Sequence, residues 1–198
     1  MTQANILCSQ ERQRYMACSW SLNPRRPRFS MLRAHELPPQ GTGGQTEYSN
    51  SRAAHDDLSD EMKEKIKDLV GCNSIYHNRK MANPNMEIYK NIDFLDYVMA
   101  KHKIDSFHEP SGRYSLYVTS YPHYIEGMPI DEGQALIKES FEHIQKPEYK
   151  LVHHRENNND MAMWDTTAAL HQATHDTYGA KYQRDFRHLL TQVLMHMV

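Results

Sequence analysis

The chain of 198 residues has few cysteines, no excess of charge of one sign and no long apolar run. Its three cysteines form no CxxC pair, which argues against a disulfide framework and a structural zinc site and favours a reducing compartment. A formal net charge of −2 gives no electrostatic footprint for nucleic acid or an anionic membrane, since both need clustered Lys and Arg. The first residues also lack the apolar core of a signal peptide, and no run could span a bilayer. We therefore expect a soluble, cytoplasmic protein with small-molecule partners.

Histidine, by contrast, is plentiful. Thirteen histidines are many for this length, and imidazole is both a common ligand of transition metals and a proton carrier near pH 7. Hydrophobic residues make up 39% of the chain and charged residues 24%, as is usual for one globular domain with a core of ordinary size. Composition therefore permits a small-molecule enzyme but assigns no role to any one histidine.

Several short strands are predicted from the apolar pattern. A strand is expected over residues 28–37, where Pro38 and Pro39 end it, followed by a glycine loop at residues 41–44 and a second strand at 45–49. Further strands are expected at Arg113–Thr119, Tyr149–His154 and Met161–Trp164. We expect a mainly β arrangement with peripheral helices.

The first of the expected helices begins at Ser59. Asp60 and Glu61 follow in the first turn, where their charges meet the positive end of the helix dipole. An apolar stripe at helical spacing continues to Val70, and Gly71 is a suitable residue to close the helix.

Two more helices are predicted further along the chain. One covers Asp131–Ile144 and is stopped by Pro147. In the other, apolar residues from Phe186 to Met197 recur at helical spacing without a Gly or Pro break. Residues 189–198 are therefore expected to form a helical tail.

Three separated segments together resemble a known family. They read RAHELPPQGTGGQTEYSNSRAAHDDLSDEMKEKIKDL, then EPSGRYSLYV, then ENNNDMAMWDTTAALHQATHDTYGAKYQRDFR. In their order and residue sequence they resemble the taurine dioxygenase / 2,4-dichlorophenoxyacetate dioxygenase (TauD/TfdA) family of Fe(II)- and 2-oxoglutarate-dependent oxygenases, especially its fungal-type members. The resemblance covers roughly residues 21–187. It implies an α+β, mainly β fold: a partial double-stranded β-helix, or jelly roll, at residues 23–188, after a poorly specified segment at 1–22.

The resemblance also implies a site. In the family, a His-x-Asp pair and a distal histidine bind Fe(II) and leave positions open for 2-oxoglutarate and O2, whose reaction releases succinate and CO2. His171, seven residues after Trp164-Asp165, matches the distal ligand, and Arg184 matches the arginine that grips the remote carboxylate of 2-oxoglutarate. Thr46 matches a threonine that also reaches this cosubstrate. No catalytic side chain beyond the metal ligand is implied.

This chain departs from the family pattern at three places. Ala17 stands at the position of the first histidine and Ser19 at that of the carboxylate, and neither can replace an iron ligand. His188, with Arg187 beside it, stands where the family often has an arginine for an anionic substrate group, so both are expected to be weak substrate contacts. The predicted helical tail replaces the closing strand of the roll. The fold is therefore expected to be incomplete at both ends.

Some of the residue patterns have purely structural interpretations. His55-Asp56-Asp57 and His154-Arg155-Glu156 have a histidine two residues before a carboxylate, but short patterns of this kind are often accidental. We interpret both as decoys and place the first on a solvated polar face. Without the resemblance, His171 would be a structural histidine, Arg184 a surface or ion-paired arginine and Thr46 a turn hydroxyl.

Two functions from different classes follow. The first is a 2-oxoglutarate-dependent dioxygenase that hydroxylates, or similarly oxidises, a small organic acid or secondary metabolite. The alternative is a truncated, catalytically inactive family remnant that acts as a binding or oligomerisation module. In that case the predicted C-terminal helix and an open sheet edge would form a homo-oligomer.

Overall fold

The residues that the computed structural model describes are 21–39, 41–43, 45–82, 84–89, 93–174 and 185–191, the last of these as backbone alone. The strands are β1 (Phe29–Glu36), β2 (Thr46–Asn50), β3 (Val70–Asn73), β4 (Ala100–Lys103), β5 (Asp105–His108), β6 (Arg113–Leu116), β7 (Pro122–Ile125), β8 (Lys150–His153), β9 (Met161–Asp165), β10 (Ala169–Ala173) and β11 (Asp185–Thr191). The α-helices are α2 (Ser51–Asp56), α3 (Asp60–Ile66), α4 (Ile75–Ala82) and α5 (Ile130–Ile144), and short 3-10 turns lie at Glu87–Tyr89, Phe94–Asp96, Glu109–Ser111 and Pro147–Tyr149.

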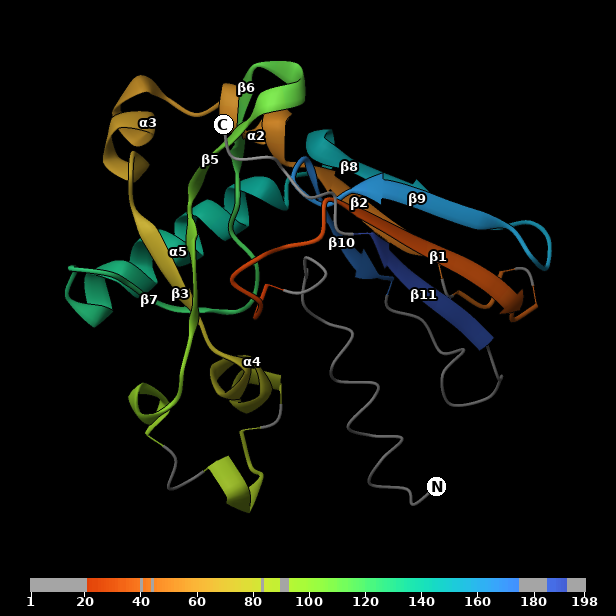
Figure 1. Cartoon of the computed structure of the whole chain (residues 1–198), viewed down its shortest axis with the longest axis horizontal. Helices are drawn as coiled ribbons and strands as arrows, with labels where there is room; N and C mark the ends of the chain where they lie inside the picture. The colour runs from red at the N-terminus through yellow and green to blue at the C-terminus, as the bar shows by residue number, and fades with distance from the viewer. Residues whose placement is uncertain are drawn as a thin grey trace.

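Two antiparallel sheets of three strands form one side of the molecule, with strand orders β11-β1-β9 and β10-β2-β8 (Figure 1). Trp164 of β9 is 8% exposed, and its ring centroid lies 5.2 Å from that of Tyr48 on β2 and 4.9 Å from that of His171 on β10. A buried indole in contact with both rings joins the two sheets through one shared interior.

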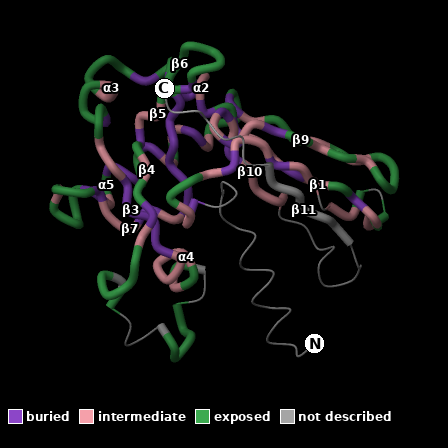
Figure 2. The backbone as a smooth tube through the Cα atoms, in the orientation of Figure 1, coloured by how far each residue is buried: buried purple, intermediate pink, exposed green. Residues whose placement is uncertain are grey.

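The other side of the molecule is built from the sheet β4-β3-β7, the hairpin β5-β6 and the helix α5. The most deeply buried side chains of its core are at most 1% exposed and include Ile66, Ile104, Leu116, Ile125 and Ile144. Figure 2 shows the buried stretches gathered where these elements meet, while the turn between β8 and β9 is exposed. This core supports the two sheets through α2, which directly follows β2.

Most of the predicted elements are confirmed. The strands expected over residues 28–37, 45–49 and 161–164 are β1, β2 and β9, and those expected at 113–119 and 149–154 contain β6 and β8. The helix expected at 131–144 is α5, with Asp131 and Glu132 in its first turn. Within the described part of the chain, no helix is long and apolar enough to cross a membrane.

The helix that begins after Ser59 is shorter than predicted. Ser59 caps α3 as expected, by accepting a hydrogen bond from the Met62 backbone N–H at 3.1 Å. However, α3 ends at Ile66, and Gly71 lies in strand β3 instead of closing a helix. Asp68 has φ of 60°, a left-handed conformation that stops a right-handed helix, and pairing of β3 with β4 then determines the following residues.

The prediction of a helical tail is wrong for the part that the structure describes. Residues 185–191 form strand β11, which pairs antiparallel with β1 from Asp185 opposite Glu36 to Thr191 opposite Phe29. A neighbouring strand edge offers a full row of backbone hydrogen bonds, and this outweighs a helical spacing of apolar residues. The closing strand that was expected to be missing is thus present, and residues 192–198 lie outside the described residues.

Candidate functional site

Thr46 and His171 lie on one face of the sheet β10-β2-β8. His171 is the register partner of Tyr48, and Thr46 is the partner of Ala173. Alternate residues of a strand share a face, so Thr46, Tyr48 and His171 all belong to the same face. The contact of Trp164 with Tyr48 and His171 shows that this face turns toward the other sheet. The structure therefore brings together two of the residues predicted from the resemblance.

Arg155 joins this group, although sequence reasoning placed it inside a decoy. It follows the end of β8, and its Nη1–H donates a hydrogen bond to Thr46 Oγ1 at 3.1 Å. Burial lowers the pKa of Arg155. Burial also raises the pKa of Tyr48, and the nearby charge of Arg155 opposes that rise. The sequence could have pointed to Arg155, because this residue directly follows the predicted strand Tyr149–His154.

A cavity of about 370 Å³ lies beside Arg155. It is lined by the loop between β1 and β2 and by residues 154–156. Gly41 and Gly43 of that loop have φ of 81° and 100°, values that residues with a side chain rarely adopt, so the predicted glycine turn is confirmed at these two positions. The loop thus forms one wall of a space that a small molecule could enter.

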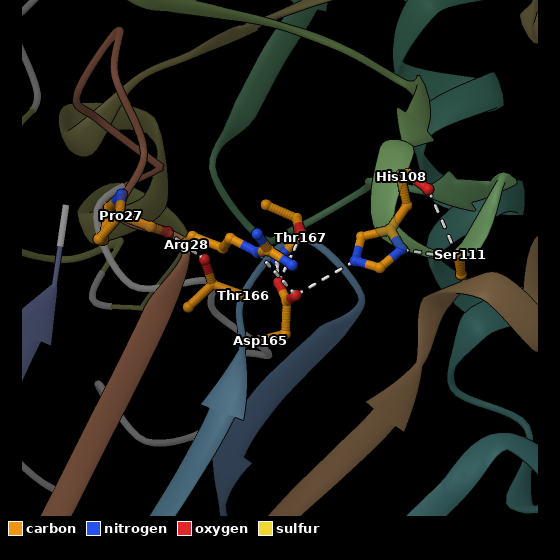
Figure 3. Close-up of polar contacts among 7 residues, drawn as sticks. All are labelled: Pro27, Arg28, His108, Ser111, Asp165, Thr166 and Thr167. Carbon is orange, nitrogen blue, oxygen red and sulfur yellow. Dashed lines mark hydrogen bonds and ion pairs between the residues drawn. The ribbon is translucent and has the colours of Figure 1, made fainter. Parts of the chain in front are cut away.

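Asp165 is the centre of a polar cluster that fixes the turn between β9 and β10 (Figure 3). One of its carboxylate oxygens accepts a hydrogen bond from the Thr167 backbone N–H at 2.9 Å. The other faces His108 Nε2 at 3.1 Å and Arg28 Nε at 3.4 Å. His108 Nδ1 lies 2.7 Å from Ser111 Oγ.

This cluster, which we call the Asp165 cluster, comprises Arg28, His108, Ser111, Asp165 and Thr167. It connects the start of β1 and the end of β5 to the turn that leads into β10. Burial raises the pKa of Asp165, but hydrogen bonds from Thr167 and His108 outweigh burial and hold that pKa below its usual value. The carboxylate is therefore stable in its charged form, and the cluster holds the beginning of the strand that carries His171.

The prediction that His55-Asp56-Asp57 lies on a solvated face is confirmed for Asp56 and Asp57, which are exposed, and wrong for His55. His55 is 7% exposed, and its Nε2 lies 3.1 Å from Asp105 Oδ1. Asp56 pairs instead with Arg113. The side chains of the pattern thus have separate structural partners and do not converge.

A second cavity of about 370 Å³ lies beside α5 and has mostly apolar walls. His77 lines it, and the Nδ1 atom of His77 lies 3.1 Å from that of His123. Burial, followed by the nearby His123, lowers the pKa of His77 to about 4. This histidine therefore stays neutral at physiological pH.

A complete iron site is not formed by the described residues. Among them, no group of three or more His, Cys, Asp or Glu side chains could hold a metal ion. His171 is present, whereas Ala17, Ser19 and Arg184 lie outside the described residues. Arg187 and His188 are in β11, where their backbones pair with Arg33 and Leu32.

The sequence matches the family model described as "Taurine catabolism dioxygenase TauD, TfdA family" over residues 8–191. The chain belongs to this family. The TauD/TfdA chain is 30% identical, over 164 residues, to an alpha-ketoglutarate-dependent 2,4-dichlorophenoxyacetate dioxygenase of Burkholderia sp. strain RASC, covering 83% of this chain and 53% of that protein. It is 28% identical over 172 residues to the enzyme of the same name from Cupriavidus pinatubonensis, covering 83% and 55%.

Solved structures agree with this membership. A crystal structure of AAD-2 in complex with Mn(II) and N-oxalylglycine matches with a TM-score of 0.82 and 28% identity, over 100% of this chain and 68% of that one. A taurine dioxygenase from Burkholderia xenovorans has the same fold, with a TM-score of 0.72 and 22% identity, over 91% and 59%. The TauD/TfdA chain spans about half the length of the curated relatives it matches.

Proposed function

We propose that this TauD/TfdA chain is a 2-oxoglutarate-dependent dioxygenase that oxidises a small organic acid or secondary metabolite with O2. The observation that carries this proposal is the shared face of Thr46, His171 and Arg155 in a chain of this family. The relatives act through alpha-ketoglutarate, which is 2-oxoglutarate, as their names state. None of these matches supports the alternative of an inactive binding or oligomerisation module.

The two sheets joined by Trp164 are best understood as part of the family's double-stranded β-helix. In such a roll the interior face carries the site, and Thr46 and His171 both occupy that face. Thr46 would donate its hydroxyl hydrogen to a carboxylate of 2-oxoglutarate, and Arg184 would hold that same carboxylate with its two-pronged guanidinium. The protein thereby orients the cosubstrate.

The iron is the demanding part of the proposal. His171 would bind one position, but an alanine methyl at 17 has no donor atom, and a serine hydroxyl at 19 is a much weaker ligand than a carboxylate. A working site therefore needs ligands other than Ala17 and Ser19. On the substrate side, Arg187 would attract an anionic group more strongly than His188, because a guanidinium is permanently charged and offers a two-pronged donor.

Anaerobic titration of the chain with Fe(II) and 2-oxoglutarate tests the function directly. The bidentate chelate on iron gives a weak visible charge-transfer band, and admission of O2 with substrate should release succinate. His171→Ala should abolish both signals, whereas His35→Ala, on the other sheet, should leave them intact. Absence of both signals from the unaltered chain would contradict the proposed function and leave family membership unaffected.

A further inference from the structure

We propose that Arg155, together with Thr46, forms a carboxylate-binding point that holds 2-oxoglutarate in this chain without help from the metal. This inference rests on the proposed function, because it concerns the same cosubstrate. It adds a residue that the resemblance does not supply and that the sequence pattern assigned to a decoy. It also gives the chain a way to bind a dicarboxylate while its iron site is incomplete.

The geometry places the guanidinium of Arg155 at the interior face. Thr46 pairs with His153 at the end of β8, and Arg155 lies two residues beyond that pair, so an extended backbone returns its side chain to the face of Thr46. The 3.1 Å hydrogen bond from Arg155 Nη1 to Thr46 Oγ1 confirms this direction. Thr46 itself is 5% exposed, so the contact lies inside the fold.

The electrostatics favour an anion at this point. Burial lowers the pKa of Arg155 because it penalises the charge, while the Tyr48 side chain, which hydrogen-bonds to Arg155, opposes that shift in part. A guanidinium has so high an ordinary pKa that it stays charged despite this penalty, and a carboxylate ligand would offset it through two parallel hydrogen bonds. The cosubstrate therefore gains more here than at an exposed arginine, where water competes.

The nearby carboxylate of Asp160 has another task. Its Oδ2 accepts hydrogen bonds from the backbone N–H groups of Glu156 and Asn157 at 3.0 and 2.9 Å. These bonds lower the pKa of Asp160 and close the turn between β8 and β9. Asp160 thus attracts Arg155 at longer range, while its Oδ2 atom serves the turn.

There is also room for a ligand beside the guanidinium. The cavity of about 370 Å³ that Arg155 lines falls in the usual size range of small-molecule sites. A Cβ atom at Gly41 would meet nothing within 4 Å, so the glycine loop that lines this cavity is not closely packed at that position. Arg155 thus connects the two: it lines this cavity and donates a hydrogen bond to Thr46, so a carboxylate in the cavity would meet the guanidinium that Thr46 holds in place.

Calorimetric titration of the EDTA-treated chain with 2-oxoglutarate, and separately with N-oxalylglycine, tests the inference without turnover. Arg155→Gln should weaken binding about tenfold or more, because a hydrogen bond to a charged group is lost. Arg155→Lys should bind with intermediate affinity, since lysine keeps the charge but not the fork. Thr46→Val should also weaken binding.

Arg33→Gln is the matched control. Arg33 is an exposed arginine on β1 that donates to Asn159 Oδ1 at 2.9 Å, and its loss should leave dicarboxylate affinity unchanged. Thermal unfolding of each variant shows whether it is folded, and Arg155→Lys keeps the test valid if Arg155→Gln does not fold. Equal affinity of the folded Arg155 variants and the unaltered chain would overturn the inference.

The outcomes also separate this inference from the proposed function. Succinate release by an Arg155→Gln variant whose apparent KM for 2-oxoglutarate is unchanged would overturn the role of Arg155 while supporting the dioxygenase. Conversely, metal-free binding that depends on Arg155 in a chain that never releases succinate would support Arg155 and contradict the dioxygenase. Failure of the unaltered, metal-free chain to bind either dicarboxylate would overturn the inference.

Discussion

Replacing Asp165 by asparagine should destabilise the fold by about 2 to 3 kcal/mol. The substitution keeps the shape of the side chain but removes the charge that His108 Nε2 approaches at 3.1 Å and Arg28 Nε at 3.4 Å. A hydrogen bond to a charged group contributes about 1.5 to 3 kcal/mol. The contact at 3.4 Å is near the limit of a hydrogen bond and contributes little, so most of the loss comes from His108.

The loss is measurable as a lower midpoint of thermal unfolding, followed by circular dichroism. For a chain of this length, each kcal/mol shifts the midpoint by about 2 to 4 °C, so the expected decrease is about 4 to 12 °C. Glu64→Gln is the control, because Glu64 pairs with Lys67 at a surface where both side chains are more than half exposed. That variant should unfold at the same temperature as the unaltered chain.

The pH dependence provides a second check on the same carboxylate. The pKa of Asp165 is lower in the folded chain than in the unfolded chain, where it is near 3.9. Its contribution to stability is therefore fully present above about pH 4 and is lost as the pH falls through the folded-state pKa. The difference between the unaltered chain and Asp165→Asn should shrink in that acid range. An unchanged unfolding midpoint at pH 7 would refute the reasoning about the Asp165 cluster.

Two further predictions concern the tail and the second cavity. In an antiparallel pair, one of any two consecutive N–H groups faces the partner strand, so of Leu189→Pro and Leu190→Pro at least one should remove a donor from the ladder between β11 and β1. That variant should have a lower urea midpoint than the alanine variant at the same position, and equal midpoints at both positions would contradict a paired strand. His77 has a pKa of about 4 in the folded chain and near 6.5 in the unfolded chain. Between these two pH values the unfolded chain binds more protons, so the free energy of unfolding should fall as the pH decreases from about 6.5 to 4. His77→Gln should flatten that decrease in urea unfolding series, and an equally steep decrease would count against it.

Elements specified by neighbouring residues were predictable from the sequence. Ser59 caps α3 through its own third neighbour along the chain, and Pro38 ends the region of β1, so both boundaries follow from local chemistry. The tail shows the limit of this reasoning. Leu189 and its neighbours have helical spacing, yet they pair with a strand more than 150 positions away, which no local pattern reveals.

The candidate site likewise contains residues that could be predicted from the sequence and one that could not. The positions of His171 and Thr46 on one face agree with the family resemblance, because the Trp164-Asp165 pair and the glycine loop anchor both segments in the alignment. Arg155 was missed because its partner Thr46 is 109 positions away. The roles of all the site residues stay predictions, namely His171, Thr46, Arg184, Arg187 and His188, and so do the boundaries of the segments at residues 22 and 188.

The position of Trp164 has a practical consequence. Its indole touches Tyr48 and His171 at the interior face, and the sequence contains just one other tryptophan, Trp20. In a Trp20→Phe background, the tryptophan fluorescence of the chain, excited at wavelengths that tyrosine does not absorb, would come from Trp164 alone. The emission intensity would then change when a molecule displaces or polarises the rings around Trp164, so ligand binding at this face could be followed by fluorescence without an added label.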